Sequence, residues 1–159
     1  MSDFTADFCD TYPDKVSVLG AGFSNYGGAS MCQGEVVTIK LNLNNSDLIT
    51  LLRDENGKGK VVVVDADAAY YAIVGEKLMQ FAQTSGFAGI IVNGYIRDTF
   101  QIKDIPVALY ALGTCSRKSI PVTQGERDGT LKFGGVEFRP GNYVYADTDG
   151  VIVTEAPLA

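Results

Sequence analysis

The amino-acid sequence predicts a single mixed α/β domain in which β layers pack with a few helices. A length of 159 residues, 46% of them apolar, suits one domain with its own core. Strand, helix and strand patterns follow one another between residues 60 and 92, which favours a crossover unit with parallel strands. The last third instead has short strand patterns divided by turn dipeptides, which is typical of an antiparallel meander.

The first half of the chain contains a strand, a short helix and a second strand. Residues 34–41, GEVVTIKL, are rich in β-branched side chains and are predicted to form a strand. Ser46 is the expected cap of a helix from Asp47 to about Asp54, which has leucines at helical spacing. The continuous apolar run of residues 60–65, KVVVVD, predicts a strand that is buried on both faces.

The second half adds one long helix and several strands. Residues 71–85 show amphipathic helical spacing, and Gly86 is a suitable C-terminal stop. Residues 89–92 and 107–111 are predicted strands. Three short strands are then expected in the meander, with the sequences VEF, YVYAD and VIVTE.

The composition excludes several classes of site. The absence of histidine removes Ser-His-Asp triads, Cys-His nucleophile pairs and histidine metal sites. A bound metal would need oxygen ligands, which points to Mg²⁺, Mn²⁺ or a similar hard cation. The net charge of −6 and the lack of a Lys/Arg cluster disfavour direct nucleic-acid binding.

The cysteines and the N-terminal stretch indicate the compartment. Cys9, Cys32 and Cys115 are far apart and odd in number, so neither a disulfide framework nor a zinc-thiolate site is expected. Arg117 and Lys118 lie close to Cys115, but without a base partner an inert thiol is favoured. No apolar run approaches the ~18 residues of a membrane span. The acidic start lacks signal-peptide features, so we expect a cytoplasmic protein without membrane association.

The first candidate site is the dipeptide Arg97-Asp98, which follows the predicted strand 89–92. In α/β proteins, ligands bind in the crevice at the C-terminal ends of parallel strands. Asp98 offers a hard oxygen for a divalent cation, and Arg97 offers a positive fork for a carboxylate, carbonyl or enolate oxygen. The alternative is a solvated surface pair, which is the commoner case for such a dipeptide taken alone.

The second candidate is the stretch VGEKLMQF, residues 74–81. Gly75 precedes the regular helical spacing, so the amides from Gly75 to Leu78 are candidates for an anion site at a helix N-terminus. The alternative is a glycine that only permits a tight loop, with Glu76 favouring the helix dipole.

Other conspicuous residues favour structural interpretations. Asp65 and Asp67 follow a buried strand, and capping of the next segment is favoured over a role beside a metal. Asp147 and Asp149 flank a turn and are interpreted as turn residues. The glycine-rich stretch FSNYGGAS, residues 23–30, lacks the Lys-Ser/Thr ending of a phosphate-binding loop.

Several segments together resemble one known family. FSNYGG, GEVVTIK, VVVVD, GEKL, GIIVNGYIRD, KFGGV and YVYADTDGVIV resemble the family of the regulator of ribonuclease activity A. That family also contains the metal-dependent 4-hydroxy-4-methyl-2-oxoglutarate / 4-carboxy-4-hydroxy-2-oxoadipate aldolases. The resemblance extends from Cys9 to Leu158. An acidic residue, twenty further residues and Arg-Asp mark the aldolase branch, and Glu76, Arg97 and Asp98 have this spacing here. The bacterial ribonuclease regulators typically lack the Asp.

The resemblance implies a role for each of these residues. Asp98 would be the direct ligand of a divalent metal, most simply Mg²⁺ or Mn²⁺. Arg97 would contact the pyruvyl oxygen, and Glu76 would hold a metal-bound water or help to move a proton. The amides of one loop would hold the substrate carboxylate, and this loop consists of Gly75, Glu76, Lys77 and Leu78.

The resemblance also implies the architecture and the activity. It implies a layered β/β/α sandwich with a mixed, swivelling-domain-like sheet over residues 1–159, and a ring-shaped homotrimer with sites between subunits. The expected substrates are small 2-oxo acids, because aldol cleavage to pyruvate and oxaloacetate decarboxylation both pass through pyruvate enolate. Residues 66–70 replace a glycine-rich stretch of many members, which leaves the substrate preference open.

Two other functions follow from the family. One is a protein inhibitor of an endoribonuclease that acts by protein–protein binding, and the acidic charge suits a basic partner. The other, menaquinone methylation, is an older label in this family. It finds no support, because no glycine-rich methyl-donor loop follows a first strand.

Overall fold

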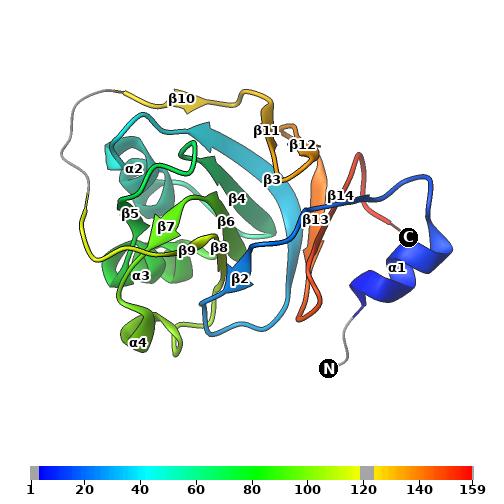
Figure 1. Cartoon of the computed structure of the whole chain (residues 1–159), viewed down its shortest axis with the longest axis horizontal. Coiled ribbons are helices and arrows are strands. Elements are labelled where there is room, and N and C mark those ends of the chain that lie inside the picture. Colours follow the sequence, from blue (N-terminus) through cyan, green and yellow to red (C-terminus); the bar gives the residue numbers. More distant parts are fainter. Residues whose placement is uncertain (1–3, 119–123, 159) are drawn as a thin grey trace.

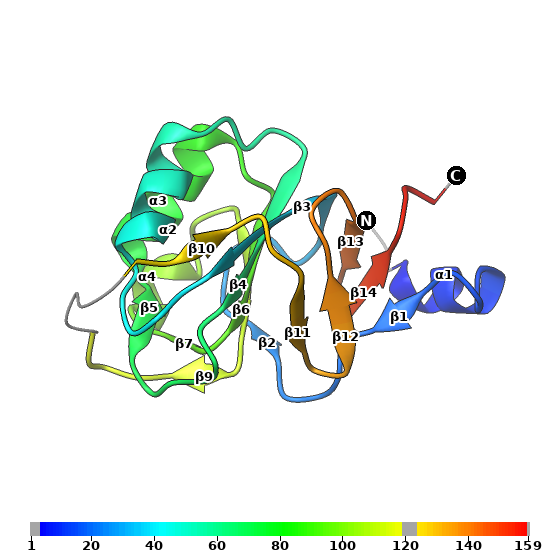
Figure 2. The same ribbon diagram turned by 90° about the horizontal axis from the view of Figure 1, so that it is seen from above.

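The computed structural model describes residues 4–118 and 124–158, which form three layers (Figures 1 and 2). A central sheet has helices on one face and further β-structure on the other, as expected for a β/β/α sandwich. Among the described residues, nine strands form the main sheet in the order β1-β14-β13-β3-β4-β6-β8-β2, with β10 paired to β3. Its strands are β1 (Ser17–Val18), β2 (Ser24–Asn25), β3 (Cys32–Lys40), β4 (Lys60–Asp65), β6 (Gly89–Asn93), β8 (Ala108–Ala111), β10 (Glu126–Arg127), β13 (Tyr143–Ala146) and β14 (Val151–Thr154).

The remaining elements are four helices and two small sheets. The helices are α1 (Thr5–Thr11), α2 (Ser46–Asp54), α3 (Glu76–Ser85) and α4 (Thr99–Ile102). One small sheet contains β5 (Ala72–Val74), β7 (Tyr95–Ile96) and β9 (Gly113–Thr114), and the other pairs β11 (Leu131–Phe133) with β12 (Val136–Phe138). The structure confirms the predicted mixed sheet, because β3, β4, β6 and β8 run parallel while β13 and β14 are antiparallel. No helix within the described residues 4–118 and 124–158 is long and apolar enough to cross a membrane.

Strand β4 separates two hydrophobic cores. Val62 and Val64 pack with the leucines of α2 and with Met79 of α3. Val61 and Val63 pack on the opposite face, where Phe138 of β12 is fully buried. The alternation of side chains along a strand therefore places the four valines in two cores, and the prediction of burial on both faces is confirmed.

The two predicted helices over these cores are present, but their beginnings differ from the prediction. Helix α2 begins at Ser46, so Ser46 is not its cap. The residue before it, Asn45, makes no side-chain capping bond, and the side-chain oxygen of Asn44 accepts a hydrogen bond from the Ser46 amide at 2.6 Å. Helix α3 begins only at Glu76, so the predicted start at Tyr71 is wrong. Residues 72–74 form β5, because this apolar, partly β-branched segment pairs with β7. Gly86 ends α3 in the left-handed conformation, with φ of 91°, as predicted.

The C-terminal meander is confirmed only in part, because the VEF strand β12 pairs with β11 in a separate sheet and not with β13. Strands β13 and β14 pair in antiparallel register, and β13 also pairs with β3. The N-terminal helix α1, for which the sequence patterns gave no prediction, lies at the far side of β13 and β14 from α2 and α3 (Figure 1). The ring of Phe8 packs edge-on against that of Tyr145, with centroids 4.9 Å apart.

Candidate active site

The small sheet β5-β7-β9 brings three loops together. Each of its strands follows a parallel strand of the main sheet, since β5 follows β4, β7 follows β6 and β9 follows β8. The three short strands are themselves parallel. Their C-terminal ends therefore lie at one edge, and the residues that follow are Gly75, Arg97 and Cys115. Arg97 therefore does follow a parallel strand, but this strand is β7 rather than β6.

Arg97 is anchored on both sides by main-chain carbonyls. Its amide donates to the carbonyl of Val74 at 3.0 Å, which ties it to the end of β5. Its guanidinium Nη1 donates to the carbonyl of Ser116 at 3.2 Å, and the residue is half-buried. The remaining N–H groups of the guanidinium are available for a ligand oxygen.

Asp98 has an unusual backbone conformation, and its side chain is oriented toward the start of helix α3. Its φ of 66° and ψ of 37° are left-handed values, which are uncommon for a residue other than glycine. Its carbonyl accepts hydrogen bonds from the amides of Gln101 and Ile102 and so starts helix α4. Its carboxylate Oδ2 accepts a hydrogen bond from the amide of Glu76 at 2.9 Å. The carboxylate is thereby held at the N-terminus of α3.

Arg97 and Asp98 do not neutralise each other. The ion pairs found between described residues include neither side chain. The left-handed turn at Asp98 separates the two groups, so that the carboxylate reaches α3 and the guanidinium reaches the chain after β9. Among the described residues, no ion pair therefore joins Arg97 to Asp98, and a positive and a negative group that do not pair with each other lie at the end of β7.

The four predicted loop residues differ in whether their main chain or their side chain can contribute to this site. Gly75 is the residue before α3, and Glu76, which is half-buried, starts the helix. The expectation of free amides is wrong for Glu76, because its N–H is bonded to Asp98. Lys77 is exposed, with its ammonium 6.0 Å from the centre of the Phe81 ring. The Leu78 side chain lies in the core on the helix side, so only its main chain can face a ligand.

The acidic pair after β4 has a structural role, as predicted. Asp65 Oδ1 accepts hydrogen bonds from the Asp67 amide and from the Asn93 side chain, both at 2.9 Å. The Lys40 ammonium lies 3.3 Å from Asp65 and 2.8 Å from Asp67. These two carboxylates therefore cap the turn and pair with Lys40.

A divalent metal fits Asp98 as a singly ligated ion. No group of three or more Asp, Glu, Cys or His side chains in residues 4–118 and 124–158 is placed to hold a metal. Asp98 is exposed, and its Oδ1 accepts no hydrogen bond from a described residue. Mg²⁺ commonly binds proteins through one or two carboxylates and keeps several waters, and one free carboxylate oxygen suits that coordination.

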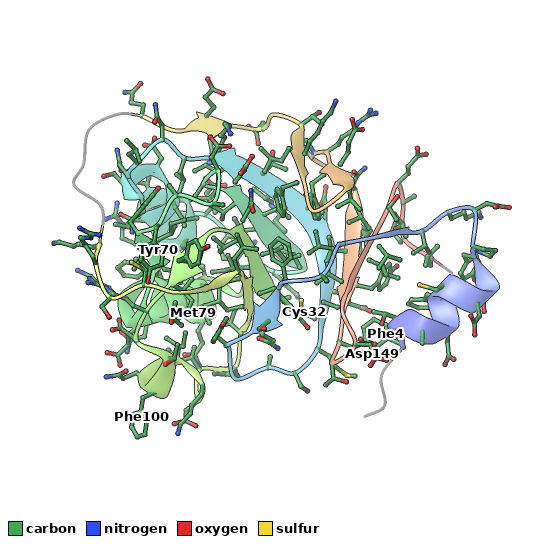
Figure 3. The ribbon with its side chains drawn as sticks, viewed as in Figure 1. Phe4, Cys32, Tyr70, Met79, Phe100 and Asp149 are labelled. Atoms are coloured by element: carbon green, nitrogen blue, oxygen red, sulfur yellow. The ribbon has the colours of Figure 1, made fainter. Side chains whose placement is uncertain are left out.

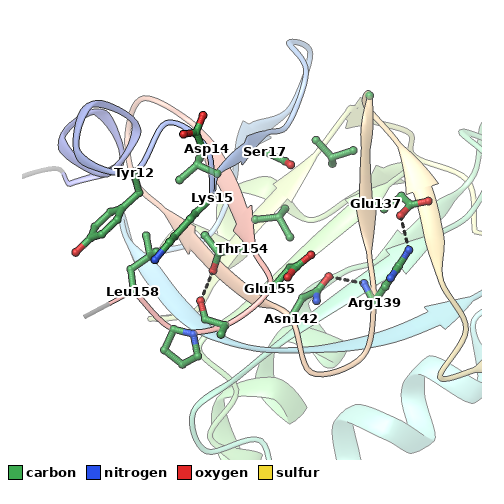
Figure 4. A pocket seen from close by; sticks show the side chains of 16 residues that line it. Tyr12, Asp14, Lys15, Ser17, Glu137, Arg139, Asn142, Thr154, Glu155 and Leu158 are labelled. Atoms are coloured by element: carbon green, nitrogen blue, oxygen red, sulfur yellow. Dashed lines mark hydrogen bonds and ion pairs between the residues drawn. The ribbon is translucent and has the colours of Figure 1, made fainter.

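Two hollows of the surface lie elsewhere. A groove of about 1020 Å³ runs between the segment after α1 and the end of the chain, with Lys15, Arg139 and Glu155 among its lining residues (Figure 4). A hollow of about 490 Å³ lies between the glycine-rich stretch and the turn at Asp149. Neither hollow is lined by Glu76, Arg97 or Asp98.

Sequence reasoning missed the groups that orient Arg97. The Ser116 carbonyl lies 19 residues further along the chain, and the Val74 carbonyl belongs to a segment predicted as helix. Both are main-chain atoms, and a main-chain carbonyl leaves no signature in the residue types. Only the pairing of β5 and of β9 with β7 would have located them.

Comparison with known proteins identifies the family of the chain. A family model described as RraA-like, Aldolase/RraA, matches residues 5–153. The chain belongs to this family. This RraA-like chain is 41% identical over 160 residues to a protein of Hahella chejuensis named "Putative 4-hydroxy-4-methyl-2-oxoglutarate aldolase". The match covers 100% of this chain and 97% of the relative.

Two solved structures are similar to this RraA-like chain over nearly its full length. One is described as an S-adenosylmethionine: 2-dimethylmenaquinone methyltransferase from Geobacillus kaustophilus, with 40% identity, a TM-score of 0.93 and coverage of 99% and 97% of the two chains. The other is the RNA-processing inhibitor RraA from Thermus thermophilis, with 34% identity, a TM-score of 0.93 and coverage of 100% and 96%. The three relatives thus carry three different functional names on one fold.

Proposed function

We propose that the chain is a divalent-metal-dependent lyase that cleaves 4-hydroxy-4-methyl-2-oxoglutarate-type 2-oxo acids to pyruvate, with oxaloacetate decarboxylation as a side activity. The observation that supports it is the separation of Arg97 from Asp98, which leaves a guanidinium fork and a carboxylate side by side but unpaired. The name of the Hahella chejuensis relative supports the same substrate class. The complete spacing of Glu76, Arg97 and Asp98 adds the motif of the aldolase branch.

The reaction needs stabilisation of a developing enolate. In the cleavage, a base removes the proton of the 4-hydroxyl, the C3–C4 bond breaks, and its electron pair forms the enolate of pyruvate. A proton then returns to C3. Arg97 would bind the 2-oxo oxygen, where the negative charge grows, and its two anchored sides reduce the reorganisation that this requires. Decarboxylation of oxaloacetate yields the same enolate by loss of CO₂.

The other residues have supporting roles in this proposal. Asp98 would hold the metal, Mg²⁺ or Mn²⁺, which as a Lewis acid supplies further charge stabilisation. Glu76, half-buried at the start of α3, would move a proton between substrate and water. The main-chain amides of Lys77 and Leu78 are in the first turn of α3, where no intrahelical partner exists, and they would bind the substrate carboxylate.

A ring-shaped trimer belongs to the same proposal, as does the swivelling-domain-like classification of the fold. Asp98 is exposed and Arg97 is half-buried, so a neighbouring subunit would have room to complete the site around them. Phe100, just beyond Asp98, is 74% exposed and projects from α4 (Figure 3), as expected for a side chain that a partner covers. Light scattering after size-exclusion chromatography tests the trimer.

The test of the activity couples pyruvate release to lactate dehydrogenase. Purified protein is assayed with 4-hydroxy-4-methyl-2-oxoglutarate and with oxaloacetate, with Mg²⁺ or Mn²⁺, with a chelator, and as the Asp98→Ala variant. We expect turnover above the metal-only rate, lost with chelator and in the variant. Protein that is loaded with metal and releases no pyruvate from either substrate would refute the proposal.

A second function is favoured by the similarity to the RNA-processing inhibitor RraA. In this proposal the chain binds a ribonuclease or its partner proteins and masks them, and its charge of −6 would favour a basic partner surface. Affinity purification against an RNA-degradation complex tests it, with Asp98→Ala alongside the unaltered protein. Binding that survives in this variant would show a function independent of the lyase site, and absence of binding would count against regulation.

A further inference from the structure

The backbone of Gly75 does not explain why this residue is a glycine. Its φ of −138° and ψ of −162° are extended values that any residue adopts. The position before a helix also favours Ser, Thr, Asp or Asn, whose side chains can cap the helix. The reason for a glycine therefore has to come from a neighbouring group.

That neighbour is the carboxylate of Asp98. A Cβ atom added to Gly75 would lie 2.5 Å from Oδ2 of Asp98, but 3.4 Å from its Cγ and 3.5 Å from Cγ of Arg97. The first separation is too short for a non-bonded contact, and the other two are acceptable. Of these three atoms, only Asp98 Oδ2 thus needs the space that a Cβ at position 75 would fill, and it is an oxygen of the proposed metal ligand.

The same oxygen is the acceptor of the Glu76 amide at 2.9 Å. This N–H lies in the first turn of α3, where the helix dipole favours a negative charge. Asp98 meanwhile has a left-handed backbone, which costs a non-glycine residue energy unless its surroundings compensate. The bond from Glu76 and the space at Gly75 both act on Oδ2, and Oδ1 accepts no hydrogen bond from a described residue.

We infer that Gly75 and the main-chain N–H of Glu76 are positioning groups for Asp98, which direct Oδ2 to the start of α3 and leave Oδ1 for the divalent cation. The inference rests on the proposed function, because it needs Asp98 to be the metal ligand. It also gives the Glu76 N–H a protein partner in place of the substrate carboxylate.

The hydrogen bond is tested by comparing Glu76→Pro with Glu76→Ala. Both variants lose the side chain, but only proline loses the N–H. Proline is tolerated at the first position of a helix, and it favours an extended residue before it, as Gly75 is. The readout is the Mn²⁺ dissociation constant, measured from the free-Mn²⁺ electron paramagnetic resonance signal, which does not depend on turnover. We expect binding roughly 10- to 100-fold weaker for Glu76→Pro than for Glu76→Ala.

The space at Gly75 is tested with Gly75→Ala. The group that must move is the end of a side chain, so the variant should fold with an unchanged unfolding temperature while the carboxylate is displaced. The matched control is Gly129→Ala, because a Cβ there meets nothing within 4 Å and φ is not left-handed. Mn²⁺ binding should weaken about tenfold or more in Gly75→Ala and stay unchanged in Gly129→Ala.

The outcomes separate this inference from the proposed function. If Asp98→Ala loses Mn²⁺ while Gly75→Ala and Glu76→Pro bind it as their controls do, the positioning role is wrong and the metal ligand stands. If Asp98→Ala binds Mn²⁺ as tightly as the unaltered protein, the metal assignment is wrong and the inference is overturned with it. Weakening in both positioning variants, with circular dichroism unchanged, supports the inference.

Discussion

The carboxylate of Asp147 holds the start of helix α1 through Thr5, although the two residues are 142 positions apart. Oδ2 accepts hydrogen bonds from the amides of Phe4 and Thr5 at 2.8 and 2.7 Å, and Oδ1 accepts one from the Thr5 hydroxyl at 2.8 Å. Burial alone would raise the pKa of Asp147, but these bonds and one from the Asp149 amide outweigh it and lower the pKa. The hydrogen bond from the Asp149 amide thus confirms the predicted turn role of Asp147. The bonds to the start of α1 give Asp147 a second, long-range structural role.

Replacing Asp147 should therefore make the free energy of unfolding depend less on pH in the acidic range. We expect Asp147→Asn to lower the free energy of unfolding at pH 7 by about 1–3 kcal/mol, since buried donors lose a charged acceptor. Because the folded-state pKa is lowered, this contribution is complete above the unfolded pKa of about 3.9 and is lost as pH falls through the folded-state pKa. Urea unfolding at several pH values should show the two proteins converging below about pH 4. A constant difference at all pH values would contradict this account.

Arg97→Ala should affect the reaction far more than the fold. If Arg97 stabilises the enolate oxygen, its loss should lower kcat by roughly 10²–10³. Arg97→Lys should recover only part of this, because an ammonium cannot bond the Ser116 carbonyl and the substrate as a rigid fork does. The control is Arg139→Ala, an exposed arginine that pairs with Glu137 beside the other groove. Equal rates for Arg97→Ala and the control would exclude the role.

The loop after β4 carries backbone strain that a glycine would relieve. Asp67 and Ala68 have left-handed φ values of 53° and 55°. Ala68→Gly should therefore raise the free energy of unfolding by about 1 kcal/mol. Ala69→Gly is the matched control, because Ala69 has no such φ, and it should lower stability by about 0.5–1 kcal/mol. Denaturant unfolding of both variants measures the difference, and the same sign for both would contradict the strain.

The three thiols should differ in reactivity. Burial raises the pKa of the Cys32 thiol to about 12, and Cys115 is also buried, whereas Cys9 is only half-buried on α1. The thiolate is the reactive form, so a disulfide reagent at mildly alkaline pH should modify Cys9 first and leave Cys32 unmodified until the protein unfolds. Mass spectrometry of the labelled peptides identifies the site. Rapid labelling of Cys32 in the folded protein would show that the main-sheet core opens easily.

Most elements of this fold follow from local patterns. The four valines of β4 predicted a doubly buried strand because a short, continuous run of β-branched residues is typical of strands covered on both faces. Gly86 predicted the end of α3 because glycine adopts the left-handed conformation at low cost. The start of α3 was misplaced by five residues, since residues 71–74 also fit helical spacing and only pairing with β7 makes 72–74 a strand.

The candidate site divides in the same way. The residue types and the spacing of Glu76, Arg97 and Asp98 are properties of the sequence, and they determined which chemistry is available without histidine. The hydrogen bond from Glu76 to Asp98 and the bond from Arg97 to Ser116 belong to the tertiary structure alone. Each joins a side-chain atom to a main-chain atom of a segment about 20 residues away, and main-chain atoms are the same in nearly every residue. The sequence by itself therefore determined the strand and helix patterns and the reactive groups, whereas the packing of β5, β7 and β9 decided that the side chains of Arg97 and Asp98 contact different segments instead of pairing with each other.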